Sequence, residues 1–204
     1  MRKIGIIHGS DSDLPQMYEG LLFLRACVKE GSAQILSVDS ASQHRHTLLV
    51  QEILELYHQW SEANRPQVLI VCAGWANHLT GCVDAYLRYK LRNDKIVVFG
   101  VAFEDENPEN TQAAILSILR VPGTQVVYKG VGTEGFLKAC QDAVNEKLPE
   151  IKLKESPAHH RRNLQEAIGE AFTRSRAQLV AISGVKKSVI DQSTFDQSKL
   201  IKTT

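Results

Sequence analysis

The sequence has few cysteines and almost no net charge, and each of these features excludes a class of protein. None of its four cysteines, at positions 27, 72, 82 and 140, forms a Cys-x-x-Cys pair, which argues against a structural zinc site or a disulfide framework. Its 24 basic and 23 acidic residues leave a net charge of +1, so no long-range field attracts nucleic acid or an anionic membrane. The composition favours a site for a small molecule.

The sequence also lacks a long apolar run. No segment approaches the roughly 20 apolar residues that span a bilayer, and the first residues lack the apolar core of a signal peptide. We therefore expect a soluble, cytoplasmic protein that binds neither nucleic acid nor a membrane.

Short apolar segments alternate with amphipathic segments along the first 149 residues. This alternation is typical of βαβ units and a parallel sheet. It predicts a doubly wound, flavodoxin-like α/β fold with a five-stranded parallel sheet in the strand order 2-1-3-4-5. The predicted strands are 4–8, 34–38, 68–72, 96–101 and 126–128, and the predicted helices are 14–29, 48–63, 81–91, 108–119 and 133–148.

The composition changes after residue 149, where we expect an α/β domain (1–149) to give way to a C-terminal extension (150–204). A helix is predicted at 156–181, and the polar last twenty or so residues are expected to fray. An apolar stripe along this helix needs another surface to cover it, and a neighbouring subunit is expected to supply that surface. The stripe consists of Leu164, Ile168, Phe172 and Leu179.

Three polar segments follow the first three predicted strands, at residues 9–13, 42–47 and 73–78. In the predicted strand order the first and third strands are neighbours at the switch point, where ligands bind beyond the carboxyl ends of the strands. The three segments are therefore expected to converge on one small, phosphate-bearing substrate.

The first polar segment opens a predicted helix. Free backbone N–H groups and the helix dipole can hold an anion there, with Ser10 and Ser12 donating further hydrogen bonds. The alternative is that Ser12 or Asp13 simply caps the helix. The local sequence leaves both interpretations open.

The second polar segment places a proton carrier beside an anion anchor. The imidazole of His44 can give and take a proton near neutral pH, and the guanidinium of Arg45 matches a phosphate bidentately. The alternative is a loop of exposed polar residues, and His46 is equally compatible with a solvated imidazole.

The third polar segment combines small residues with polar ones. Its glycine and alanines let the backbone approach a ligand closely, and Asn77 and His78 add polar contacts. Trp75 either stacks on a heterocycle or fills the core.

Taken together, these segments resemble the PurE family of purine biosynthesis, which comprises 5-(carboxyamino)imidazole ribonucleotide mutases and aminoimidazole ribonucleotide (AIR) carboxylases. The family's GSxSD motif corresponds to residues 9–13, its SAHR motif to 42–45 and its GAGGAAHLPG motif to 72–81. A fourth motif, LSIVQMP, corresponds to residues 116–122. The motifs occur in the family's order, so the resemblance is specific although each motif is imperfect.

The resemblance implies a role for each matching residue. His44 is the general acid and base, Arg45 binds the phosphate, and Ser10 and Asp13 hold the ribose phosphate end of the substrate. It also implies that no metal or organic cofactor is needed and that the subunits form a homo-octamer. The remaining implied substrate contacts are Ser12, Ser42, Ala73, Gly74, Asn77, His78 and Leu79.

The family chemistry is carboxylation of the imidazole ring carbon. By resemblance, His44 protonates the N-carboxy substrate so that its carbamate releases carbon dioxide, and later removes the proton from the carboxylated ring carbon. The carboxylase branch uses carbon dioxide directly, and the resemblance does not choose between the two donors.

The third motif departs from the pattern of both branches. Trp75 replaces the glycine of the mutase branch and the arginine of the carboxylase branch, whereas Asn77 matches the carboxylases and His78 the mutases. Arg120 also resembles the carboxylase branch, and residues 104–106 are acidic where the family is apolar. Two alternatives stay open: a non-catalytic paralogue that binds a phosphoribosyl ligand, and an enzyme that carboxylates another heterocycle.

Overall fold

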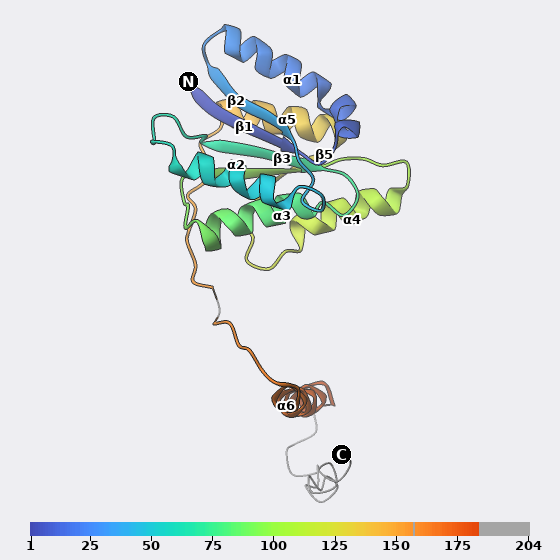
Figure 1. The fold of residues 1–204 in the computed structure, drawn as a ribbon. Helices are drawn as coiled ribbons and strands as arrows, with labels where there is room; N and C mark the ends of the chain where they lie inside the picture. Colours follow the sequence, from blue (N-terminus) through green and yellow to red (C-terminus); the bar gives the residue numbers. More distant parts are fainter. Residues whose placement is uncertain (157, 184–204) are drawn as a thin grey trace, which may run out of the picture. The chain divides into compact units, whose positions relative to one another are not determined.

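The computed structural model describes residues 1–156 and 158–183, and the chain divides into two compact units, Met1–Ser156 and Pro157–Thr204. The first unit contains a sheet of five parallel strands in the order β2-β1-β3-β4-β5, which confirms the predicted topology (Figure 1). The strands are β1 Arg2–His8, β2 Ala33–Ser40, β3 Val68–Ala73, β4 Val97–Ala102 and β5 Val127–Val131.

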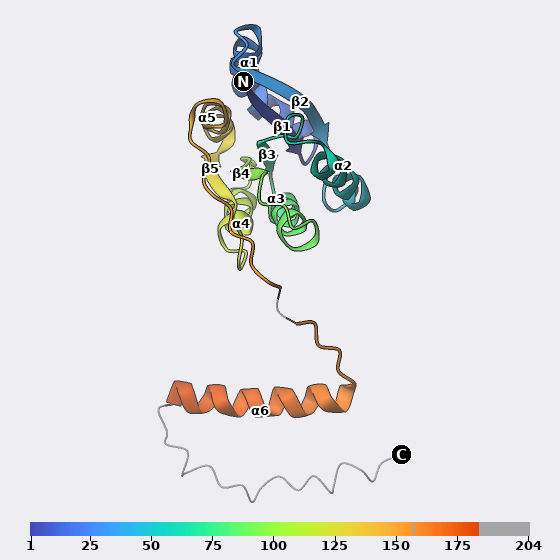
Figure 2. The same ribbon diagram turned by 90° about the vertical axis from the view of Figure 1, so that its left-hand side faces the viewer.

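Helices cover both faces of this sheet. Figures 1 and 2 show α1 and α5 on one face and α2, α3 and α4 on the other. A short 3-10 helix, η1 (Asp11–Asp13), precedes α1, and α3 continues into a π-helical segment, η2 (Tyr86–Lys90). The helices are α1 Leu14–Lys29, α2 Thr47–Gln59, α3 His78–Ala85, α4 Pro108–Leu119 and α5 Gly132–Asn145.

The core consists of two main apolar layers, one on each side of the sheet. Met17 and Phe136 pack against one side, whereas Leu54 and Val83 pack against the other. All six residues of β3 are buried, because a central strand of a doubly wound sheet is covered on both faces. This burial explains why the predicted strand at 68–72 is almost entirely apolar.

The residues just beyond 149 belong to the first compact unit. Ile151 is buried in the core with α1 and α5, and the side chain of Gln125 exchanges two hydrogen bonds of 2.8 Å with the backbone of Lys152. The assignment of residues 150–204 to a separate extension stays a prediction.

The second unit contains the helix α6, Leu164–Ser183. The prediction that this helix begins at residue 156 is wrong, because Asn163 caps it. The Asn163 side chain accepts the Glu166 N–H at 2.9 Å, and the Glu166 carboxylate accepts the Asn163 N–H at 2.9 Å.

Three members of the predicted stripe, Leu164, Ile168 and Phe172, are exposed on α6. The Leu179 side chain and the predicted fraying of the tail lie outside what the structure describes. No helix within residues 1–156 and 158–183 has the length and apolar character needed to cross a membrane.

Candidate active site

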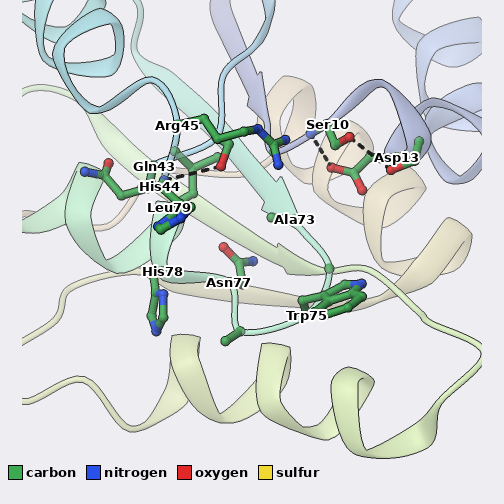
Figure 3. Close-up of a pocket in the computed structure, with 15 residues that line it drawn as sticks. Ser10, Asp13, Gln43, His44, Arg45, Ala73, Trp75, Asn77, His78 and Leu79 are labelled. Atoms are coloured by element: carbon green, nitrogen blue, oxygen red, sulfur yellow. Dashed lines mark hydrogen bonds between the residues drawn. The ribbon is translucent and has the colours of Figure 1, made fainter.

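A cavity of about 580 Å³ lies beyond the carboxyl ends of β1, β2 and β3 (Figure 3). It is lined by residues from all three polar segments, so the predicted convergence of these segments is confirmed. Every residue that the sequence predicted for the site lines this cavity. The lining residues are Gly9, Ser10, Ser12, Asp13, Ser42, Gln43, His44, Arg45, Ala73, Gly74, Trp75, Ala76, Asn77, His78 and Leu79.

The cavity includes three residues that the sequence did not assign to substrate binding: Gly9, Gln43 and Ala76. It also includes Trp75, for which stacking on a heterocycle was one of two interpretations. Gly9 allows the first and third loops to approach closely, because a Cβ atom at this position would lie only 2.9 Å from the Cβ of Ala73. All four residues belong to the polar segments or motifs that mark the site, and for Gly9, Gln43 and Ala76 this membership was the only sequence signal.

The first loop is held by its own polar groups. The buried carboxylate of Asp13 accepts the Ser10 N–H at 2.9 Å, and the Ser12 hydroxyl donates to the Ser10 hydroxyl at 3.1 Å (Figure 3). Neither Ser12 nor Asp13 caps α1 itself with its side chain, but Asp13 forms a capping box with Ser10 at the start of η1, the 3-10 helix that leads into α1. The helix-capping interpretation therefore holds for Asp13 at η1. The carboxylate fixes the loop that precedes the helix.

Burial raises the pKa of Asp13, although the Ser10 N–H, the nearby His8 and the Gly9 N–H each lower it. His8 ends β1 and is 2% exposed, and its Nδ1 lies 2.8 Å from the Ser10 carbonyl oxygen. The sequence predicted His8 only as a strand residue, since nothing in the local pattern shows that its side chain supports the first loop.

The second loop is folded by hydrogen bonds that leave two side chains unengaged. The Ser42 hydroxyl accepts the His44 N–H at 3.3 Å, and the Ser42 N–H donates to Nδ1 of His46 at 3.3 Å. His46 therefore bonds to its own loop and does not line the cavity. The exposed side chains of His44 and Arg45 form no hydrogen bond within the described part of the chain, and Arg45 extends toward Ser10 and Asp13 (Figure 3).

The third loop is anchored by Asn77, which is 2% exposed. Its Nδ2 donates to the Val101 carbonyl at 3.0 Å, while its Oδ1 accepts the Thr80 N–H at 3.2 Å and the Thr80 hydroxyl at 2.8 Å. Asn77 thereby caps α3 and ties the loop to β4. A direct contact between Asn77 and the substrate stays a prediction.

Trp75 is not a core residue. It is 68% exposed and has a φ of 53°, which is unusual for a bulky side chain. The core-filling interpretation of Trp75 is therefore wrong, and the indole is left at the cavity.

The cavity combines anion-binding groups with proton carriers. Its lining contains one guanidinium, from Arg45, and two imidazoles, from His44 and His78, beside the single carboxylate of Asp13. This set suits a small anionic ligand that undergoes proton transfer. Within residues 1–156 and 158–183, no three His, Cys, Asp or Glu side chains are grouped to hold a metal ion.

Comparison with known proteins assigns this architecture to a family. The family model for AIR carboxylase matches residues 3–147, which include all of the sheet except Arg2 and all three loops of the cavity. The chain belongs to the AIR carboxylase family. The PurE resemblance is thus confirmed, and it makes the chain an enzyme of the AIR carboxylase and mutase type.

One curated member of this family is similar over most of its length. The N5-carboxyaminoimidazole ribonucleotide mutase of Pyrococcus abyssi (strain GE5 / Orsay) is 30% identical over 156 residues, which cover 76% of this chain and 80% of that protein. The aligned region is therefore long enough to contain the complete α/β unit.

Proposed function

We propose that this protein places a carboxylate on the imidazole ring carbon of AIR, with His44 as the proton carrier. The observation that supports this most is the arrangement of the second loop. It presents an imidazole and a guanidinium, both without hydrogen bonds in the described chain, to one cavity lined by two further loops. A protein that only binds a phosphoribosyl group needs the guanidinium but has no use for an adjacent proton carrier.

The phosphate of the ribonucleotide binds Arg45 and the serines of the first loop. Arg45 offers two parallel N–H donors, and the hydroxyls of Ser10 and Ser12 lie 3.1 Å apart on the same side of the cavity. Because Oδ2 of Asp13 is used by the Ser10 N–H, its second oxygen is the one that accepts a ribose hydroxyl. The carboxylate thus binds sugar while Arg45 and the two serine hydroxyls bind phosphate.

The chemistry needs one proton that leaves His44 and returns to it. His44 gives its proton to the exocyclic nitrogen of the N-carboxy substrate as the C–N bond of the carbamate breaks and carbon dioxide leaves. The electron pair of the ring carbon then forms a C–C bond to carbon dioxide. His44 removes the proton from this carbon, which restores the aromatic ring and regenerates the imidazolium. No electrons are gained or lost overall.

The carbamate is the first candidate for the carboxyl donor, because the similar protein of Pyrococcus abyssi is named as a mutase. Direct use of carbon dioxide is the second candidate, because Asn77 and Arg120 agree with the carboxylase branch. In that case the ring proton passes through His44 to solvent.

An ultraviolet assay tests the proposal and separates the two donors. Purified protein is incubated with AIR and bicarbonate, and separately with the N-carboxy form of AIR, and formation of the ring-carboxylated product is followed. Product from the carbamate alone supports the mutase, and product from bicarbonate supports the carboxylase. A folded protein that binds AIR but yields no product from either donor would favour the non-catalytic paralogue.

We also propose that the protein assembles as a homo-octamer in which the exposed stripe of α6 contributes to subunit contacts. Leu164, Ile168 and Phe172 are 78%, 49% and 42% exposed, and an exposed apolar stripe of this kind favours association. Light scattering at micromolar concentration is expected to return the octamer mass. A monomer under these conditions would contradict the assembly without affecting the assignment of the cavity.

A further inference from the structure

Trp75 occupies a conformation that its own packing does not explain. Among the described residues only two non-glycine residues, Trp75 and Arg92, have a positive φ, and this conformation is unfavourable for a bulky side chain. Burial in the core does not compensate for the strain, because 68% of Trp75 is exposed. A strained residue that remains at a cavity is a reason to look for a function there.

Asp105, in the loop before α4, lies near the indole. The pKa of its carboxyl is lowered chiefly by hydrogen bonds from the Asn107 N–H and the Asn110 side chain, and less by an interaction with Trp75. Both of the larger hydrogen bonds measure 2.9 Å and fix Asp105 at the start of α4. Figure 3 shows the indole nitrogen directed away from Asn77.

The neighbours of the indole in its own loop are too small to cover it. Ala73, Gly74 and Ala76 flank Trp75 and line the same cavity. The exposed indole thus lines the same cavity as Arg45 and the first loop. This arrangement matches a ligand with an anionic end and a planar ring. The guanidinium binds the anionic end, and an indole stacks on the face of a planar heterocycle.

We propose that Trp75 is a specificity-determining residue that stacks on the heterocycle of the bound ribonucleotide. This inference rests on the proposed function and adds that affinity requires a planar ring as well as the phosphate. A ligand with the phosphate and no ring uses only the Arg45 side of the cavity, so it is insensitive to Trp75.

Binding of AIR to Trp75 variants tests the proposal. Trp75→Gly is expected to weaken AIR binding about 5- to 150-fold, the range that corresponds to loss of one base–aromatic stack. Trp75→Phe keeps a ring and is expected to lose less than about 5-fold. Calorimetric titration measures both constants, and ribose 5-phosphate serves as the matched ligand without a heterocycle, for which less than about a 2-fold change is expected.

Two controls separate stacking from misfolding. Glycine tolerates the φ of 53° better than tryptophan, so Trp75→Gly is expected to melt no lower than the wild type. The chain has two tryptophans, so Trp60→Phe leaves Trp75 as the single fluorescent reporter. Trp60 packs edge-on against Tyr57, at 5.1 Å between ring centroids, and does not line the cavity. AIR is expected to quench the emission of this variant, whereas ribose 5-phosphate is not.

The outcomes distinguish this inference from the proposed function. If AIR binds wild type and Trp75→Gly equally well, or if ribose 5-phosphate loses as much affinity as AIR, the stacking role is wrong and the assignment of the reaction stands. Tighter AIR binding by Trp75→Gly would also overturn stacking, because it would make Trp75 an obstruction. If the wild type binds neither AIR nor ribose 5-phosphate, the proposed function fails and the stacking role fails with it.

Discussion

Two sets of cavity residues differ in whether their side chains form hydrogen bonds within the protein. The floor, defined as Asp13 and Asn77, is buried, and both side chains form hydrogen bonds that hold a loop. The rim, defined as His44, Arg45 and His78, is exposed, and its side chains form no hydrogen bond within the described chain. The floor shapes the site, and the rim is free to act on a ligand.

This difference follows from solvation. A buried polar group without a partner destabilises the protein, so each floor residue needs bonds that persist whether or not a ligand is bound. An exposed imidazole or guanidinium is hydrated, and a ligand can replace this water at a small cost in free energy. Substitutions on the rim should therefore affect turnover and binding with little effect on stability, whereas substitutions on the floor should lower stability in addition to any loss of binding.

The largest effect is expected for His44→Asn on the rim. Asparagine keeps a polar side chain but cannot carry the proton, so turnover is expected to fall at least about 10²- to 10⁴-fold, the usual contribution of general acid–base catalysis. Binding of AIR is expected to change little, because the phosphate contacts remain. Rate assays and calorimetric titration measure the two quantities, and loss of binding with retained turnover would invert the assigned role.

A smaller effect is expected for Arg45→Ala, also on the rim. Loss of charge-assisted hydrogen bonds to phosphate, about 1.5–3 kcal/mol, corresponds to roughly 10- to 150-fold weaker binding of AIR. The nucleoside form of AIR, which has no phosphate, is the matched control and should bind both proteins alike. An equal loss for nucleoside and nucleotide would place the phosphate elsewhere.

On the floor, Asn77→Ala is expected to lower the free energy of unfolding by about 1–3 kcal/mol, because it removes the cap of α3 and leaves buried partners unpaired. Gln43→Ala is the matched cavity substitution. The half-buried Gln43 side chain forms no hydrogen bond in the described chain, so a change within about 0.5 kcal/mol is expected. Chemical denaturation measures both values. An Asn77→Ala protein of full stability that fails to bind AIR would break the distinction between floor and rim.

The smallest effect concerns the pH dependence of stability. Burial raises the folded-state pKa of Asp13 above its usual value of 3.8, so the folded state binds this proton more tightly than the unfolded state. The resulting stabilisation is fully present below pH 3.8 and is lost as the pH rises through the raised pKa of the folded state. The unfolding free energy of the wild type minus that of Asp13→Asn should therefore decrease as the pH rises across this window. Denaturation of both proteins at several pH values tests the sign, and an increase would contradict it.

The fold could be predicted from the sequence because its strands and helices alternate strictly and their apolar residues follow regular periods. The start of α6 could not be placed from the apolar pattern. Asn163 and Glu166 form a capping box at this start, and their spacing in the sequence is the signal that marks it. At the first loop, the sequence allowed Asp13 to cap α1, and only the folded loop shows that its carboxylate accepts the Ser10 N–H.

The members of the site could be predicted because parallel strands deliver three loops to one edge of the sheet. Whether each side chain is buried or exposed could not be predicted. His8 is buried with its Nδ1 at 2.8 Å from the Ser10 carbonyl oxygen, and Trp75 is exposed although it is aromatic. Both states depend on how the loops fold at the end of the sheet, and no periodic pattern of apolar residues encodes them.

The most direct test of the central claim is a single-turnover ¹³C NMR measurement on the wild type and His44→Asn, with each carboxyl donor labelled in turn. The wild type is expected to show the label in the ring carboxylate from at least one donor. His44→Asn is expected to bind AIR and show none. Equal ring labelling by both proteins, or none from a wild type that binds AIR, would contradict the assignment of this cavity as a carboxylating site with His44 as its proton carrier.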